Sequence, residues 1–242
     1  MKLLLSLPLL CCSAFSQGAA VPPPIVQIVA MPGDAGGPAR SYANGRAAVD
    51  VLGLSATTGI RQVWWIEMHP TFAGIEALDR ALNLPALGNL NGGARVMIAV
   101  LQPGWSYRPE EAARSLSKAR YMRVAIHRIG LGKEAEFGEM VRLRKVTSDS
   151  VNLDRPDLIY HVVSGDDSGT YIVLSPLSSL AMLDEEVADV PASVAPAAEA
   201  LAKAQSNAAA IEISREHLLF QVDPRLSYVS DAFAAGDSFW RP

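Results

Sequence analysis

Residues 102–107 read Gln-Pro-Gly-Trp-Ser-Tyr, and residues 223–228 read Asp-Pro-Arg-Leu-Ser-Tyr. Each stretch follows an apolar, strand-like run, over residues 96–101 and 218–222. The Pro, the Ser and the Tyr of the second stretch each lie 121 positions after their counterparts in the first. Self-similarity at one spacing is the signature of an internal repeat. The pattern therefore predicts two similar modules in tandem, each with this turn after its last strand.

The elements between these turns have the same order in both halves. Alternating apolar runs in the second half predict strands over 121–128, 157–163, 169–174 and 212–222, with helices over 133–146 and 176–187. This β-α-β-β-α-β order is ferredoxin-like. The first half predicts strands over 25–31, 62–69 and 95–101, a weak strand over 55–59, and helices over 39–54 and 70–82.

The expected fold class is therefore α+β, with one ferredoxin-like module over 25–117 and a second over 118–242. The second module is longer and is expected to carry an Ala-rich helical insertion over 188–210. A ferredoxin-like sheet is covered by helices on one face only. Because two open faces can cover each other, we expect the modules to pack as a pseudo-dimer that encloses a barrel interior.

Several stretches support this expectation by resemblance. Residues 123–137, Arg-Val-Ala-Ile-His-Arg-Ile-Gly-Leu-Gly-Lys-Glu-Ala-Glu-Phe, resemble the strand–turn–helix opening of dimeric α/β-barrel proteins. That superfamily includes the antibiotic-biosynthesis monooxygenase-like, EthD-like and NIPSNAP-like families. Residues 160–165, 223–228 and the terminal Phe239-Trp240 are similar to those of secreted bacterial proteins with two such modules, over residues 25–242. The resemblance implies two tandem modules in a dimeric-α/β-barrel-like pseudo-dimer. It implies no catalytic residue, since such folds host many activities.

The N-terminus predicts export. Lys2 is followed by an apolar run to Leu10 and by small residues to Ala20, as in a secretory signal peptide over 1–20. Cleavage is expected between Ser16 and Ala20, which leaves a Pro-rich leader over 21–24 and a secreted or periplasmic protein. Both cysteines lie inside the expected signal, so the mature chain has no thiol chemistry.

Composition excludes some partners. The net charge is −4, and no basic cluster suits a phosphate backbone, so we expect no nucleic-acid partner. No segment after the signal is long and apolar enough to span a membrane. A small-molecule ligand is the expected partner, and assembly of several copies of the chain is left open.

Strand alternation identifies the candidate site residues. In 121–128 the apolar set Met122, Val124 and Ile126 is expected to meet the helix over 133–146, and the opposite set is expected to face the barrel interior. The residues expected to line an interior pocket come from several strands: Arg123, His127, His161, His217, Trp65, Glu67 and His69. His161 is the least secure of them. Histidines scattered over strands are also common as surface or core residues, and none is paired at the spacing of a metal site.

The chemistry stays open at this point. No dinucleotide fingerprint, nucleophile elbow, metal motif or cofactor motif occurs. One hypothesis is a protein that binds a small molecule in the barrel, or a cofactor-independent small-molecule enzyme. The alternative is a structural or interaction protein whose barrel is filled by side chains. Whether the chain is an enzyme is not decided by the sequence.

Overall fold

The computed structural model describes residues 21–33, 49–82, 93–150, 155–184 and 208–241, and three single residues between 199 and 206. The expected signal peptide lies outside the described residues, as do most of the insertion expected over 188–210 and most of the helix expected over 39–54.

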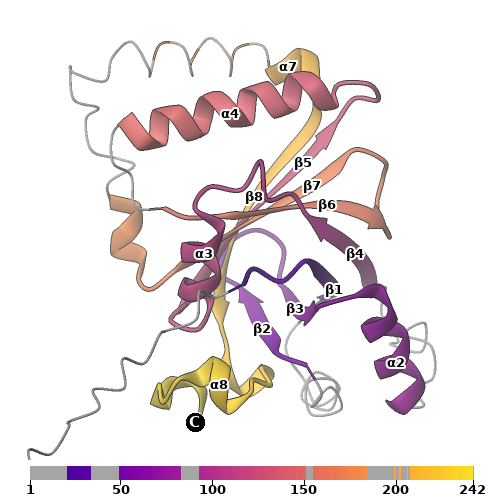
Figure 1. Cartoon of the computed structure of the whole chain (residues 1–242), viewed down its shortest axis with the longest axis vertical. Helices are drawn as coiled ribbons and strands as arrows, with labels where there is room; N and C mark the ends of the chain where they lie inside the picture. Colours follow the sequence, from indigo (N-terminus) through magenta and orange to yellow (C-terminus); the bar gives the residue numbers. More distant parts are fainter. Residues whose placement is uncertain are drawn as a thin grey trace, which may run out of the picture.

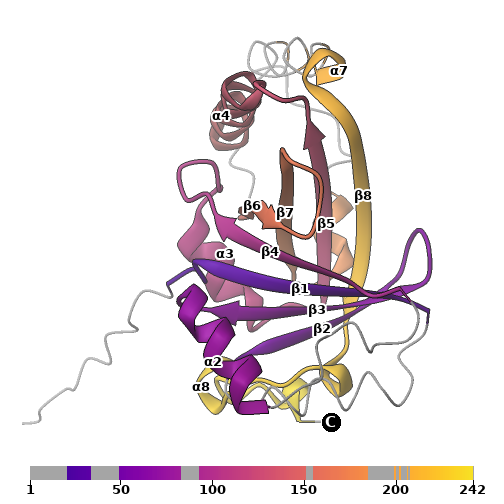
Figure 2. The ribbon, with the colours of Figure 1, turned by 90° about the vertical axis from the view of Figure 1, so that its right-hand side faces the viewer.

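Eight strands form one closed barrel in the order β1-β3-β2-β8-β5-β7-β6-β4, and every neighbouring pair is antiparallel. The strands are β1 (Ile25–Pro32), β2 (Val51–Ala56), β3 (Gln62–His69), β4 (Arg95–Leu101), β5 (Tyr121–Ile129), β6 (Leu158–Ser164), β7 (Thr170–Leu177) and β8 (Glu212–Val222). Figure 2 shows β1 to β4 running at a steep angle to β5 and β8. The expected α+β barrel is confirmed.

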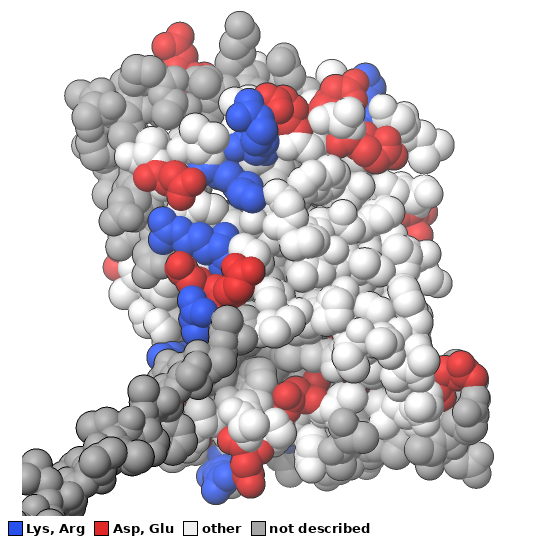
Figure 3. All heavy atoms as spheres, viewed as in Figure 1, with Lys and Arg blue, Asp and Glu red and all other residues white. Residues whose placement is uncertain are grey.

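Helices lie outside the barrel and at its ends (Figure 1). They are α2 (Phe72–Leu82), α3 (Pro109–Leu116), α4 (Glu134–Ser150), α7 (Ala208–Ile211) and α8 (Asp231–Ala234), with the 3-10 turns η2 (Leu180–Leu183), η4 (Pro224–Leu226) and η5 (Ser238–Trp240). The longest, α4, buries Phe137, Met140 and Val141 against the outer face of β5, β6 and β7. Alternating acidic and basic side chains on the face that carries α3 and α4 are visible in Figure 3.

Apolar side chains from all eight strands fill the barrel interior. Their buried cluster contains Val26, Ile28, Ala30, Leu52, Leu54, Trp64, Ile66, Met97, Ala99, Met122, Val124, Ile126, Leu158, Tyr160, Val162, Ile172, Leu174, Phe220 and Val222. Phe220 is fully buried, with its ring centre 5.1 Å from that of Trp64. Side chains therefore occupy the interior in which the sequence predicted a ligand pocket.

Side chains also cluster at both ends of the barrel. At one end, Ala112 and Leu116 of α3 and Trp240 of η5 join the interior cluster. At the other end, the buried carboxylate of Asp166 pairs with Arg95 and Arg128, each at 3.2 Å. The two guanidinium groups pair with the buried carboxylate, as a charge removed from water requires.

The face assignment made from the sequence was wrong, although the alternation was right. Met122, Val124 and Ile126 face the barrel interior, and Ala125 packs beneath α4 with Phe137. Arg123 and His127 consequently lie on the outer, helix-bearing side. The physical reason is that a closed interior has no access to water and so takes the most apolar set. The outer face is only partly covered and accommodates charge.

Two expected elements also differ. Residues 51–54, which were expected to end a helix, are the first part of β2, so the second strand begins before the expected 55–59. The expected helix over 176–187 is replaced by the end of β7 and the short turn η2 in the part that the structure describes. Val51, Leu52 and Leu54 are all fully buried, which shows that β2 is buried on both faces. A strand of this kind lacks the alternation that would distinguish it from a helix.

Candidate functional site

The outer face of β5 and β8 brings together Arg123, His127 and His217. In the antiparallel register, Arg123 is opposite Leu219, Ala125 is opposite His217 and His127 is opposite Arg215. Residues two apart on a strand share a face, so these side chains project from one side. The imidazole centres of His127 and His217 are 6.4 Å apart.

Glu212 completes this group and was not identified from the sequence. Its carboxylate lies 2.7 Å from Nδ1 of His127 and also accepts hydrogen bonds from Arg215. A register shift between Arg128 and Ile129 places Glu212 opposite Ile129. A bulge of this kind reverses the alternation beyond it, which brings Glu212 to the side of His127. Strand parity alone would have assigned Glu212 to the opposite face.

The surroundings of Glu212 set its charge. Burial raises its pKa, but hydrogen bonds from His127 and Arg215 outweigh burial and hold the pKa below the usual value. The carboxylate therefore stays ionised in the folded protein at neutral pH and orients His127. If Nδ1 of His127 donates to Glu212, then Nε2 of that ring is left as a basic atom.

Glu212 is therefore expected to stabilise the fold only where it is ionised. Since its folded pKa lies below that of the unfolded chain, its contribution is present above about pH 4.3, the usual Glu value, and is lost as the pH falls through the folded pKa. Between about pH 6 and pH 3.5, urea unfolding should show a smaller loss of stability for Glu212→Gln than for wild type. The exposed Glu110→Gln is the control and should follow the wild type. A Glu212→Gln variant with the wild-type pH dependence would contradict this assignment.

A hollow of about 220 Å³ lies against this group. It is lined by Thr58, Arg123, Leu183, His217, Leu218 and Leu219. The pKa of His217 is lowered by partial burial and by the neighbouring Arg123, His127 and Arg215, against an opposing effect of Glu212. His217 is therefore a neutral imidazole at pH 7 and can accept or donate a hydrogen bond in the hollow.

His161 lies elsewhere on the outer face of the second half of the barrel. Its ring stacks on Tyr171 at 4.7 Å, within an aromatic group that also contains Trp105 and Phe137. Phe137 in turn lies 5.4 Å from the ring of His127. His161 does not line the hollow, and its contacts are those of a packed aromatic residue.

Trp65, Glu67 and His69 are not brought to the hollow. They lie on the outer face of β3, which is separated from β5 in the barrel by β2 and β8. Trp65 packs against Leu226 and donates from Nε1 to its carbonyl at 3.2 Å. Glu67 and His69 are buried, with 3.1 Å between Oε2 and Nε2. Nδ1 of His69 has no hydrogen-bond partner within the described part of the chain.

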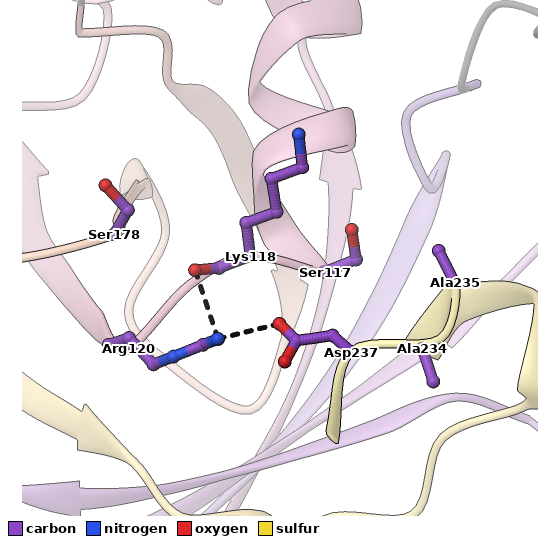
Figure 4. A pocket seen from close by; sticks show the side chains of 7 residues that line it. All are labelled: Ser117, Lys118, Arg120, Ser178, Ala234, Ala235 and Asp237. Carbon is purple, nitrogen blue, oxygen red and sulfur yellow. Dashed lines mark hydrogen bonds and ion pairs between the residues drawn. The ribbon is translucent and has the colours of Figure 1, made fainter. Parts of the chain in front are cut away.

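A second cavity, of about 370 Å³, contains none of the predicted site residues. Figure 4 shows Arg120 and Asp237 pointing toward each other across it, with Ser117, Lys118 and Ser178 around them. The guanidinium of Arg120 lies 2.7 Å from Asp237 and 3.9 Å above the ring of Phe239. These contacts hold the C-terminal segment against the barrel. The cavity therefore lies at a packing interface between that segment and the barrel.

The described residues contain no group of three or more His, Cys, Asp or Glu side chains arranged to hold a metal ion. Their helices include none with both the length and the apolar character needed to span a bilayer.

Comparison with known proteins gives the fold. No family model and no curated protein matches the sequence. Among solved structures, an anthrone oxidase-like protein is 10% identical, with a TM-score of 0.53 over 84% of this chain and 93% of that one. A candidate monooxygenase from Fusobacterium nucleatum is 7% identical, with a TM-score of 0.54 over 82% and 91%. A chlorite dismutase variant from Candidatus Nitrospira defluvii is 13% identical, with a TM-score of 0.50 over 92% and 98%.

Proposed function

We propose, on the basis of the dimeric α/β-barrel fold that this chain shares with those structures, that it binds a small molecule on the outer face of β5 and β8. The molecule would be a ligand, or the substrate of an enzyme that needs no cofactor. The observation that carries the proposal is that Arg123 and His217, from neighbouring strands, line one hollow. The proposed site therefore lies outside the barrel rather than in its interior.

The chemistry of these residues suits recognition and proton transfer. Arg123 supplies a fixed positive charge with planar donors. The pair His127–Glu212 has the arrangement of a general base and the carboxylate that orients it. His127 lies beside His217, so a proton could pass from a bound molecule to an imidazole. Structures of the same fold are described as an anthrone oxidase-like protein and as candidate monooxygenases, which is compatible with a small-molecule site but does not transfer an activity.

The proposal is tested by looking for a small molecule that co-purifies with the protein. Mass spectrometry of the purified protein under non-denaturing conditions should reveal it. Arg123→Met should lose that molecule with little change in melting temperature, because Arg123 is a partly exposed group at the outer face. Arg142→Met removes the same charge from the exposed face of α4 and should keep the molecule. A large loss of stability in Arg123→Met with no change in bound ligand would show a purely structural role.

A second candidate function follows from a different observation. The barrel interior is filled by apolar side chains, which is the property expected of a structural or interaction protein without catalysis. The two candidates differ in what the outer hollow does. If the protein carries no small molecule and binds none from a metabolite extract, the structural alternative is favoured.

We also propose that the barrel consists of two tandem ferredoxin-like modules. In its support, the first four strands are ordered β4-β1-β3-β2 and the last four β8-β5-β7-β6, so both halves have the strand order 4-1-3-2. Ser106 and Ser227 also make the same contacts. Each hydroxyl donates to a carbonyl four residues earlier, Gln102 or Asp223, at 2.9 and 2.8 Å. Each accepts from the second strand of the other half, from the amide of Ile159 or of Gly53 at 2.9 Å.

Equivalent roles predict similar losses on truncation. Ser106→Ala and Ser227→Ala should each lower the free energy of unfolding by about 1–3 kcal/mol, because a strand N–H loses its acceptor. Ser106 is fully buried and should lie at the upper end. Ser117→Ala, whose hydroxyl donates to an exposed helix-end carbonyl, serves as control and should change stability by less than about 0.5 kcal/mol. Urea unfolding measures the stability of all three variants. An unchanged free energy of unfolding for Ser106→Ala or Ser227→Ala would argue against the duplication.

Export and assembly complete the proposal. The basic, apolar and small-residue pattern of residues 1–20 supports secretion to the periplasm or beyond. N-terminal sequencing of exported protein should find a start between Gln17 and Val21, and a retained Met1 would overturn it. Assembly of copies of the chain is tested by light scattering of the purified protein.

A further inference from the structure

We propose that Arg215 is a positioning residue for His127: through Glu212 it fixes the neutral ring as the Nδ1–H tautomer and leaves Nε2 as the proton acceptor. This inference rests on the proposed function and deepens it, because it names the atom that receives a proton at this site. Three side chains form the line of contacts behind it, in which Arg215 bonds to Glu212 and Glu212 bonds to His127.

Each carboxylate oxygen of Glu212 has its own partner. Oε1 lies 2.7 Å from Nδ1 of His127. Oε2 accepts a hydrogen bond from Nε of Arg215 at 2.8 Å and lies 2.5 Å from Nη2 of the same guanidinium. The Glu212 side chain is only 7% exposed, so its carboxylate has little contact with water. The direction of the carboxylate is therefore set by these two partners.

The charge of Glu212 decides which nitrogen of His127 has the hydrogen. Burial raises the pKa of Glu212, but the hydrogen bonds from His127 and Arg215 outweigh burial, so the group is ionised at neutral pH. An ionised carboxylate accepts hydrogen bonds and cannot donate one. The 2.7 Å contact is therefore a hydrogen bond only if Nδ1 has the hydrogen. In the neutral ring, Nε2 then has the lone pair.

Arg215 maintains this arrangement. Its guanidinium is charged at every pH the protein meets and donates from a planar fork. Without it, the mostly buried carboxylate of Glu212 would keep a single donor, and burial would favour its protonated form. A protonated Glu212 can donate to Nδ1, and the ring hydrogen of His127 would then lie on Nε2. Arg215 therefore determines the state of Nε2 by acting through Glu212.

The strands hold the three side chains on one face. His127 of β5 is directly opposite Arg215 of β8. Residues three apart on a regular strand point to opposite faces, but the register shift leaves Ile213 without an opposite residue and brings Glu212 to the face of Arg215. Within the part of the chain that the structure describes, the one hydrogen bond of the His127 ring is that of Nδ1 to Glu212. Nε2 can therefore meet a bound molecule or water.

The experiment is nitrogen-15 NMR of the histidine rings in ligand-free protein at about pH 8.5, about two units above the usual imidazole pKa. An unprotonated ring nitrogen resonates far downfield of a protonated one, so wild type should show Nε2 of His127 as the downfield nitrogen. In Arg215→Gln the two resonances should approach each other or exchange places. Arg215→Lys keeps the charge but not the fork, so it should retain part of the separation. His127→Gln identifies the signals of this ring among the four histidines.

Arg142 provides the matched control, because it also makes two hydrogen bonds to a glutamate three residues earlier, Glu139 on the exposed face of α4. Arg142→Gln should leave the His127 signals unchanged. Circular dichroism of each variant shows whether a changed spectrum reflects a lost fold.

The outcomes separate this inference from the proposed function. A wild-type ring with its hydrogen on Nε2 overturns the tautomer assignment, and an Arg215→Gln ring with the wild-type separation overturns the role of Arg215. Both results leave the small-molecule site intact, since the measurement needs no ligand. If the protein neither carries nor binds a small molecule, the proposed function falls, and the role of Nε2 as acceptor falls with it whichever tautomer is found.

Discussion

Gly53→Ala is expected to lower the free energy of unfolding by about 4 kcal/mol, or to prevent folding. A Cβ atom at this position would lie 2.4 Å from Cβ of Leu226 and 2.5 Å from its backbone carbon and oxygen. Because two of these atoms belong to the backbone, no side-chain rotation relieves the clash, and η4 must move away from β2. Overpacking in a rigid core costs about 1–3 kcal/mol, and lost hydrogen bonds add to it.

The bonds that would be lost join the two halves of the barrel. The amide of Gly53 donates to Ser227, and the amide of Asp223 donates to the Gly53 carbonyl, both at 2.9 Å. Gly104→Ala is the matched control, since a Cβ there meets no atom within 4 Å, and its stability should change by less than about 0.5 kcal/mol. Urea unfolding of both variants measures the difference. If Gly53→Ala leaves the free energy of unfolding unchanged, the contacts between β2 and the chain that follows β8 do not maintain barrel closure.

Phe220→Ala is expected to cost about 3–5 kcal/mol, the usual loss for a large aromatic side chain deleted from a packed core. Phe220 is fully buried in the interior cluster and packs against Trp64. Its removal leaves an apolar cavity that should stay dry and accept benzene, so benzene should raise the melting temperature of the variant and not of wild type.

The matched control is Phe72→Ala at the start of α2, a residue that is 53% exposed. It should lose less than about 1 kcal/mol. This pair of variants also bears on where the ligand binds. A loss below about 1 kcal/mol for Phe220→Ala, or benzene binding by wild type, would show a loosely filled interior and would restore the interior pocket expected from the sequence.

The seven residues chosen from the sequence were separated by the order of the strands. Arg123, His127 and His217 meet because β5 and β8 are neighbours in the barrel. Trp65, Glu67 and His69 are remote from them because two strands intervene. His161 joined an aromatic group beneath α4. Alternation assigns residues to sets within one strand, and it carries no information about which strands become neighbours.

Glu212 shows a second limit of sequence reasoning. It belongs by parity to the same set as Ser214 and Glu216, and only the register shift beside Ile129 moves it to the side of His127. A bulge is a property of two paired strands, since it counts residues on one strand against those on its partner. No feature of residues 212–222 alone predicts this bulge.

The sequence by itself determined the element types of most strands, the turns that follow β4 and β8, and the separation of Met122, Val124 and Ile126 from Arg123 and His127. Each of these depends on local periodicity or on turn chemistry, which neighbouring residues encode. Only the tertiary structure decided which set faces the interior, that the interior is filled, and that a hollow forms on the outer face beside His217. These depend on barrel closure, because an inside and an outside exist only once β1 has paired with β4 and β2 with β8.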